Sequence, residues 1–195
     1  LGCDVSQLAQ YTQFNLRTPY KVSNDFETLA GRLAEDGIRF EQWPLASVHP
    51  NSTLSDEDIF KLYHHDIERI KRECGCQNAD VASLKEGEAF SISIRDRYLS
   101  EHCHDEDEIR FFLEGSVLIY IHINERIHIL QCGRGDFIII PKGVKHWLDI
   151  GPNPEFTSIR WYGKSELLEN NYTGSFVAES TPRWETIYGE CHFNS

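Results

Sequence analysis

The segment EHCHDEDEIR, which runs from Glu101 to Arg110, decides the fold of this chain. On a β-strand, side chains two residues apart point to the same face, so His102 and His104 project together. The acidic residues that follow turn the chain, and Glu108 then opens the next strand. Two imidazoles and one carboxylate at adjoining strand ends form a mixed nitrogen and oxygen donor set, which suits a divalent transition metal.

A third imidazole comes from the segment GDFIIIPKGVKH, from Gly135 to His146. Residues His102 to Gly115 follow the spacing H-x-H-x3-E-x6-G, and Gly135 to His146 follow G-x5-P-x-G-x2-H. These spacings match the two motifs of the cupin fold. An ordinary core histidine or a solvated acidic turn explains any one of these positions, but not all of them together. We therefore expect one metal ion, held by His102, His104, Glu108 and His146.

Short β-rich runs with tight turns fill the chain from Val81 onward. The expected strands are 89–94, 101–104, 108–113, 116–123, 126–130, 136–140, 146–150 and 156–162. Turn signals separate them, among them Gly133-Arg134-Gly135 and Gly151-Pro152-Asn153-Pro154. Eight short strands at close spacing predict a double-stranded β-helix, or jelly-roll barrel.

The N-terminal third is predicted to be mainly helical. Asn24 is a candidate N-cap for one helix, which Gly37 ends, and Ser55 begins a second helix that runs to Gly75. The residues 38–43 between them alternate like a strand. We predict a mainly β, single-domain cupin over 1–195, with a helical part at 1–80 packing on the barrel, a barrel core at 81–163 and a C-terminal tail at 164–195.

The composition excludes several classes of partner. The formal net charge of -12 repels phosphate backbones and anionic membrane surfaces, so we expect no nucleic-acid and no membrane partner. No apolar run approaches the roughly 20 residues of a membrane helix. The six cysteines show no disulfide framework, which favours free thiols in the cytoplasm. We expect a cytoplasmic monomer. Because the chain begins at Leu1 and contains no Met, we also expect the numbered sequence to be trimmed.

Four stretches carry a pattern more specific than the cupin motifs: GIRFEQW (37–43), 101–115 with EIRFFLEG at its heart, 141–149 ending in HWLD, and FTSIR (156–160). Through these stretches the chain resembles the acireductone dioxygenase family over residues 24–163. Ser116-Val117 replaces the small residue and glycine that are usual there, and the tail beyond Lys164 is unlike the family.

The resemblance implies a reaction of 1,2-dihydroxy-3-keto-5-methylthiopentene with O2 in methionine salvage. It implies one Fe(II) or Ni(II) per chain. The Fe(II) form makes formate and 4-methylthio-2-oxobutanoate, and the Ni(II) form makes formate, carbon monoxide and 3-methylthiopropanoate. Four protein ligands on an octahedral ion leave two adjacent positions, which is enough to chelate an enediolate. Such an electron-rich anion passes electrons to O2 itself, so we expect no organic redox cofactor.

Two arginines are candidates for the fixed positive charge that stabilises an anionic intermediate. Arg110 lies two residues beyond Glu108 on the same strand face, and Arg160 lies on the strand 156–162. From spacing alone, each arginine is equally a salt bridge at the barrel mouth, and the resemblance favours the catalytic role. Candidates to line an apolar slot for the methylthio tail, or equally to pack in the core, are Tyr98, Phe112, Trp147 and Leu148.

The remaining histidines of the helices and hairpins are expected to be structural or exposed: His64, His65, His122 and His128. Three other functions stay open at this point. A non-catalytic binding cupin, a cupin sugar isomerase and a manganese oxalate-degrading enzyme share the fold, although a binding cupin often loses ligands that are all present here.

Overall fold

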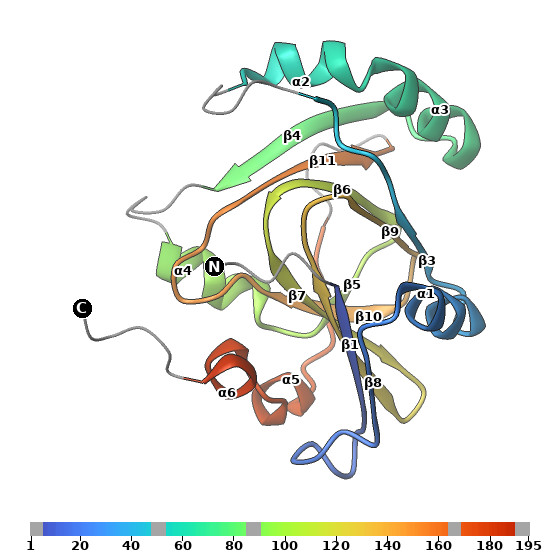
Figure 1. Cartoon of the computed structure of the whole chain (residues 1–195). Helices are drawn as coiled ribbons and strands as arrows, with labels where there is room; N and C mark the ends of the chain where they lie inside the picture. The colour runs from blue at the N-terminus through green and yellow to red at the C-terminus, as the bar shows by residue number, and fades with distance from the viewer. Residues whose placement is uncertain (1–5, 48–53, 85–90, 164–168, 190–195) are drawn as a thin grey trace.

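A computed structural model of the chain describes residues 6–47, 54–84, 91–163 and 169–189, whose strands form two antiparallel sheets (Figure 1). In sheet order, the seven-stranded sheet contains β12 (Asn171–Tyr172), β5 (His102–Cys103), β10 (Lys145–Asp149), β7 (Val117–Ile123), β8 (Arg126–Cys132), β1 (Gln7–Thr12) and β2 (Lys21–Ser23). The five-stranded sheet contains β3 (Arg39–Gln42), β9 (Asp136–Ile140), β6 (Glu108–Gly115), β11 (Phe156–Tyr162) and β4 (Asn78–Leu84). The helices are α1 (Phe26–Glu35), α2 (Asp56–Leu62), α3 (His64–Cys74), α4 (Ser91–Tyr98), α5 (Val177–Ser180) and α6 (Trp184–Tyr188).

The main apolar core lies between the two sheets. Leu8 of β1 and Ile121 of β7 pack there with Phe112 of β6 and Ile138 of β9. Burial of such side chains is the largest favourable contribution to folding, because apolar surface leaves water.

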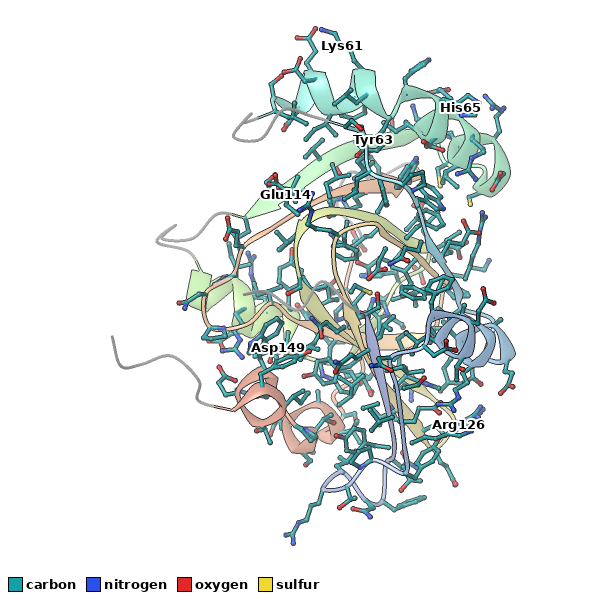
Figure 2. All side chains as sticks on the ribbon, viewed as in Figure 1. Lys61, Tyr63, His65, Glu114, Arg126 and Asp149 are labelled. Atoms are coloured by element: carbon teal, nitrogen blue, oxygen red, sulfur yellow. The ribbon has the colours of Figure 1, made fainter. Side chains whose placement is uncertain are left out.

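Strand β6 is buried on both faces, and its alternation decides what points inward. The odd-numbered Ile109 and Phe111 pack against Ile67 and Ile70 of α3, outside the sheet. Figure 1 shows α2 and α3 lying over β4 and β11 on this outer side. In Figure 2, Tyr63 points from the helices toward the sheet, whereas Lys61 and His65 point away from it. The even-numbered side chains of β6 therefore face the space between the sheets.

The outer face of the seven-stranded sheet is covered by the C-terminal helices. Tyr120 of β7 and Trp147 of β10 pack there with Ala178 of α5 and Trp184 of α6. The rings of Tyr120 and Trp147 stack at 5.1 Å. Residues 177–188 of the tail are thus part of the packed structure.

Both predicted N-terminal helices are present, with two corrections. Asp25 caps α1, because its carboxylate accepts from the backbone N–H of Thr28, so the predicted cap at Asn24 is wrong by one residue. Ser55 does cap the second helix, but that helix breaks at Tyr63 into α2 and α3. The Tyr63 hydroxyl accepts a hydrogen bond from the backbone N–H of Ala46, a contact that no local pattern encodes.

One predicted strand is a helix instead. Residues 89 and 90 of the expected strand 89–94 lie outside the described residues, and Ser91 begins α4. The alternation AFSISI is typical of a strand, but residues Ser91–Tyr98 form α4, and Arg95 of this helix binds Asp149 and Glu185 through its guanidinium. Strands β1, β2, β4 and β12 are present and were not predicted. No helix within the described ranges is long and apolar enough to cross a membrane.

Candidate metal centre

Three histidines meet on the inner face of the seven-stranded sheet, near its β12 edge. His102 of β5 and His146 of β10 face each other in the antiparallel register, and His104 follows directly after β5. One nitrogen from each of the three rings lies within 4.8 Å of the other two, and all three side chains are buried.

A backbone carbonyl fixes the tautomer of each ring. The Nδ1 atoms of His102 and His146 lie 2.7 Å and 2.9 Å from the carbonyl oxygens of Ser100 and Val144. The Nδ1 atom of His104 lies 2.9 Å from the carbonyl oxygen of Glu169. A carbonyl oxygen only accepts, so in each neutral ring Nδ1 carries the proton and Nε2 keeps its lone pair. Such carbonyl partners are the usual orienting groups of metal-binding histidines.

Glu108, the first residue of β6, supplies a carboxylate to the same point. Its Oε2 atom is 2.7 Å from Nε2 of His146 and 3.8 Å from Nε2 of His104. In the described part of the chain, Glu108 Oε2 and His146 Nε2 are buried side-chain atoms without a hydrogen-bond partner. Burial lowers the pKa of His146, but the Glu108 carboxylate beside it raises that pKa above its ordinary value. Two acceptor atoms 2.7 Å apart are compatible when a proton or a metal cation lies between or beside them. The three imidazole nitrogens and the carboxylate oxygen therefore fit the ligand set of a bound divalent ion.

Arg110 holds the other oxygen of this carboxylate. Its Nε atom donates to Oε1 of Glu108 over 2.6 Å. Burial alone would raise the pKa of Glu108, but the Arg110 guanidinium and the neighbouring His146 hold that pKa well below its ordinary value. Burial, and then the nearby His146, lowers the pKa of His102 to about 4. Once His146 has given up the proton on Nε2, the three imidazoles and the carboxylate form the N3O set that Fe(II), Ni(II) and related ions accept.

Three of the four candidate ligands, but not His146, line a cavity of about 250 Å³, whose lining residues are Arg97, Tyr98, His102, His104, Glu108, Arg110, Leu148, Arg160, Asn170 and Tyr172. Arg160 also pairs with Asp80 of β4, through Nε at 3.0 Å. Both predicted arginines thus line the cavity while making an ion pair, so the two interpretations of each are compatible.

Of the four predicted substrate residues, the structure places Tyr98 and Leu148 at the cavity and the other two elsewhere. Phe112 shares a strand face with Glu108 but lies deeper, in the apolar core between the sheets. Trp147 follows His146, so strand alternation turns it to the outer face against Tyr120.

The four other histidines in the described part of the chain lie outside the cavity lining. His64 and His65 are exposed on α3. His122 bonds the carboxylate of Glu101, and His128 bonds that of Asp36. These positions agree with the structural or exposed roles that the sequence suggested.

Three lining residues were not identified from the sequence: Arg97, Asn170 and Tyr172. Arg97 directly precedes Tyr98 on α4, and the sequence pattern predicts a strand at 89–94 instead of this helix. Asn170 and Tyr172 belong to the tail, where the sequence shows no periodic pattern.

The chain is similar to known proteins over most of its length. The model of the ARD/ARD' family matches residues 8–167. The acireductone dioxygenase of Hahella chejuensis is 34% identical over 186 residues, which cover 95% of this chain and 100% of the relative. That of Marinobacter nauticus is 36% identical over 168 residues, covering 86% and 90%. A solved structure, "Acireductone dioxygenase from Bacillus anthracis with cadmium ion in active center", matches with a TM-score of 0.75 at 21% identity over 88% of this chain and 100% of that chain. This likeness confirms the predicted mainly β cupin fold.

Proposed function

Because the chain belongs to the ARD/ARD' family, we propose that it is a metal-dependent dioxygenase that cleaves the acireductone 1,2-dihydroxy-3-keto-5-methylthiopentene with O2 in methionine salvage. One observation carries the proposal beyond family membership. The nitrogens of His102, His104 and His146 and the Oε2 atom of Glu108 converge at a cavity that also presents arginine side chains. That combination suits a small, oxygen-rich anion bound beside a divalent ion.

We propose His102, His104, Glu108 and His146 as the protein ligands of one Fe(II) or Ni(II) ion per chain. When bound, such an ion would supply Lewis-acid chemistry to the oxygen-rich end of the substrate. The protein fixes the donors in advance: carbonyl groups orient the three imidazoles, and Arg110 orients the carboxylate. Donors oriented before the metal arrives need little rearrangement to bind it.

Arg110 and Arg160 place positive charge beside the position proposed for the negatively charged enediolate. Arg110 is buried beside Glu108, and Arg160 lines the cavity from β11. A permanent guanidinium charge in a site with little water stabilises developing negative charge more strongly than the same charge does in solvent. Tyr98 and Leu148 line the apolar part of the cavity, where we place the methylthio tail.

Two finer points belong to the same proposal. The thiols of Cys74, Cys76, Cys103 and Cys132 are free, which supports a reducing compartment, and we place the enzyme in the cytoplasm. We also propose that it acts as a monomer, since one chain by itself supplies all four proposed metal ligands.

Reloading the apo-protein with one equivalent of Fe(II) or Ni(II) tests the function. With the acireductone present, either form should take up O2 stoichiometrically and release formate. The Fe(II) form should yield the keto acid, and the Ni(II) form should yield carbon monoxide. A His64→Ala variant is the matched control, because His64 is exposed and remote from the cavity lining. A metal-loaded protein that consumes no O2 would refute the proposal, and turnover of oxalate or isomerisation of a sugar would support one of the alternatives.

A further inference from the structure

We propose that the segment 169–173, called the strap below, forms one wall of the substrate pocket and that Tyr172 is a specificity-determining residue contacting the apolar tail of the acireductone. The inference rests on the proposed function. The strap lies beyond residue 167, where the match to the family model ends, so the family pattern does not assign it a role.

The strap is held in a fixed register against the strand that carries His102. Tyr172 pairs with His102 in the antiparallel ladder between β12 and β5. Next along the strap, the Thr173 hydroxyl donates to Oε1 of the buried Glu101 over 2.6 Å, and its backbone N–H donates to the carbonyl oxygen of Glu101 over 3.1 Å. The second oxygen of Glu101 is 2.7 Å from Nδ1 of His122 on β7. The register therefore does not depend on the two-residue ladder alone.

The other end of the strap contacts a metal-ligand candidate. The Glu169 carbonyl accepts from Nδ1 of His104 over 2.9 Å. The carbonyl partners of His102 and His146, which belong to Ser100 and Val144, lie only two residues away in sequence. The carbonyl partner of His104 belongs to Glu169, 65 residues away in sequence. Orientation of one donor thus depends on the strap being seated, since a carbonyl partner sets the tautomer and plane of a ligating ring.

Between these anchors, alternate side chains of the strap turn toward the cavity. Asn170 and Tyr172 both line it, and the amide nitrogen of Asn170 donates to the Tyr172 hydroxyl over 3.3 Å. Asn171, on the opposite face, donates instead to Asp105 over 3.4 Å. The Tyr172 ring meets the His102 ring edge-on, with centroids 6.0 Å apart. An aromatic ring beside a ligand of the metal is positioned to touch whatever the metal holds.

Tyr172 is 55% exposed, which leaves much of its ring available to a ligand. Among the residues that the structure describes, the other lining side chains with large apolar surface are Tyr98 and Leu148. The remainder of the lining is cationic, ligating or amide, and matches the oxygen-rich end of the substrate. We therefore place the tail among Tyr98, Leu148 and Tyr172, with the strap deciding how long a tail fits.

Two substrates test this placement: the natural acireductone and an analogue whose methylthioethyl tail is replaced by methyl. For Tyr172→Ala, KM for the natural substrate should rise about 10-fold, the scale of one lost aromatic contact, whereas KM for the short analogue should change less than about 2-fold. Turnover at saturation should stay within about threefold for both, since the ring holds no reacting atom. Tyr172→Phe should keep wild-type selectivity, and the bulkier Tyr172→Trp should shift selectivity toward the short analogue.

Phe176→Ala is the matched control, because Phe176 is an exposed aromatic of the same tail outside the cavity lining. Each variant is loaded with Ni(II), its metal content is measured, and the dissociation constant of each substrate is determined without O2. This binding readout should follow the KM values. If Tyr172→Ala binds metal poorly, Tyr172→Trp alone decides the question.

Equal effects on both substrates, or none, in metal-loaded Tyr172→Ala or Tyr172→Trp would overturn the role of Tyr172. A wild-type enzyme that oxidises neither compound would instead refute the proposed function, so the two failures are distinguishable.

Discussion

Removing the guanidinium of Arg110 tests whether this residue acts on the reaction or only on the fold. Arg110 is 6% exposed, and its Nε atom lies 2.6 Å from Oε1 of Glu108. Removing one partner of a buried ion pair costs about 3–5 kcal/mol, because the other charge stays buried without compensation. We expect Arg110→Ala to lower the free energy of unfolding of the apo-protein by about 3 kcal/mol at pH 7 and to lower it less in the Ni(II) form, where the ion compensates Glu108.

Arg110→Ala should also lower turnover by more than its loss of folding stability accounts for. Loss of one preorganised donor to developing negative charge typically lowers turnover about 100- to 1000-fold. Arg110→Lys should recover part of this loss, because a flexible ammonium group does not reproduce the planar fork. Metal content should remain near one ion per chain at neutral pH, since the four ligands are unchanged.

The assay combines urea unfolding, metal analysis and O2 uptake on the same preparations. Lys61→Ala is the control: Lys61 pairs with Glu57 at side chains that are 67% and 79% exposed, and such pairs contribute about 0–1 kcal/mol. If metal-loaded Arg110→Ala turns over within threefold of wild type, Arg110 is a structural ion pair only, and Arg160 becomes the residue to test.

Three further predictions follow from other parts of the molecule. His104→Ala should lose metal and O2 uptake together with an unchanged circular dichroism spectrum; full metal content with full turnover would contradict its assignment as a ligand. Burial raises the pKa of Asp136 to about 6, so the folded state binds more protons than the unfolded state between about pH 4 and pH 6. The free energy of unfolding should therefore fall as pH rises through that window, by at most about 3 kcal/mol, and urea titrations of Asp136→Asn should lack this contribution. Arg95→Met should expose the tail to limited proteolysis and lower stability by about 2–4 kcal/mol, because Arg95 joins the buried Asp149 to Glu185 of α6 (Figure 2 labels Asp149); an unchanged proteolysis pattern would argue against this link.

The sequence by itself predicted the four candidate metal ligands and the strands at which they lie. The spacing from His102 to Glu108 needs only the two-residue period of a strand and one acidic turn to bring the donors together. The same period places Arg110 beside Glu108, and it also turns Trp147 away from the cavity. Local rules are sufficient for these relations because each spans a few residues of one segment, whereas His146 is predicted from the spacing of the second motif, from Gly135 to His146.

Only the tertiary structure decided the rest of the pocket. Phe112 shares the strand face of Glu108 but lies farther along the strand, in the core between the sheets. The two-residue period predicts the face on which a side chain lies, but not whether that part of the face borders the cavity or the core. α4 forms where alternation predicted a strand, and its Arg95 binds carboxylate partners 54 and 90 residues away, which no local pattern indicates. Tyr172 reaches the cavity only because Thr173 and Glu169 are bonded to residues 72 and 65 positions earlier. Contacts over such separations are set by how the sheets pack, and a single sequence carries no local signal of them.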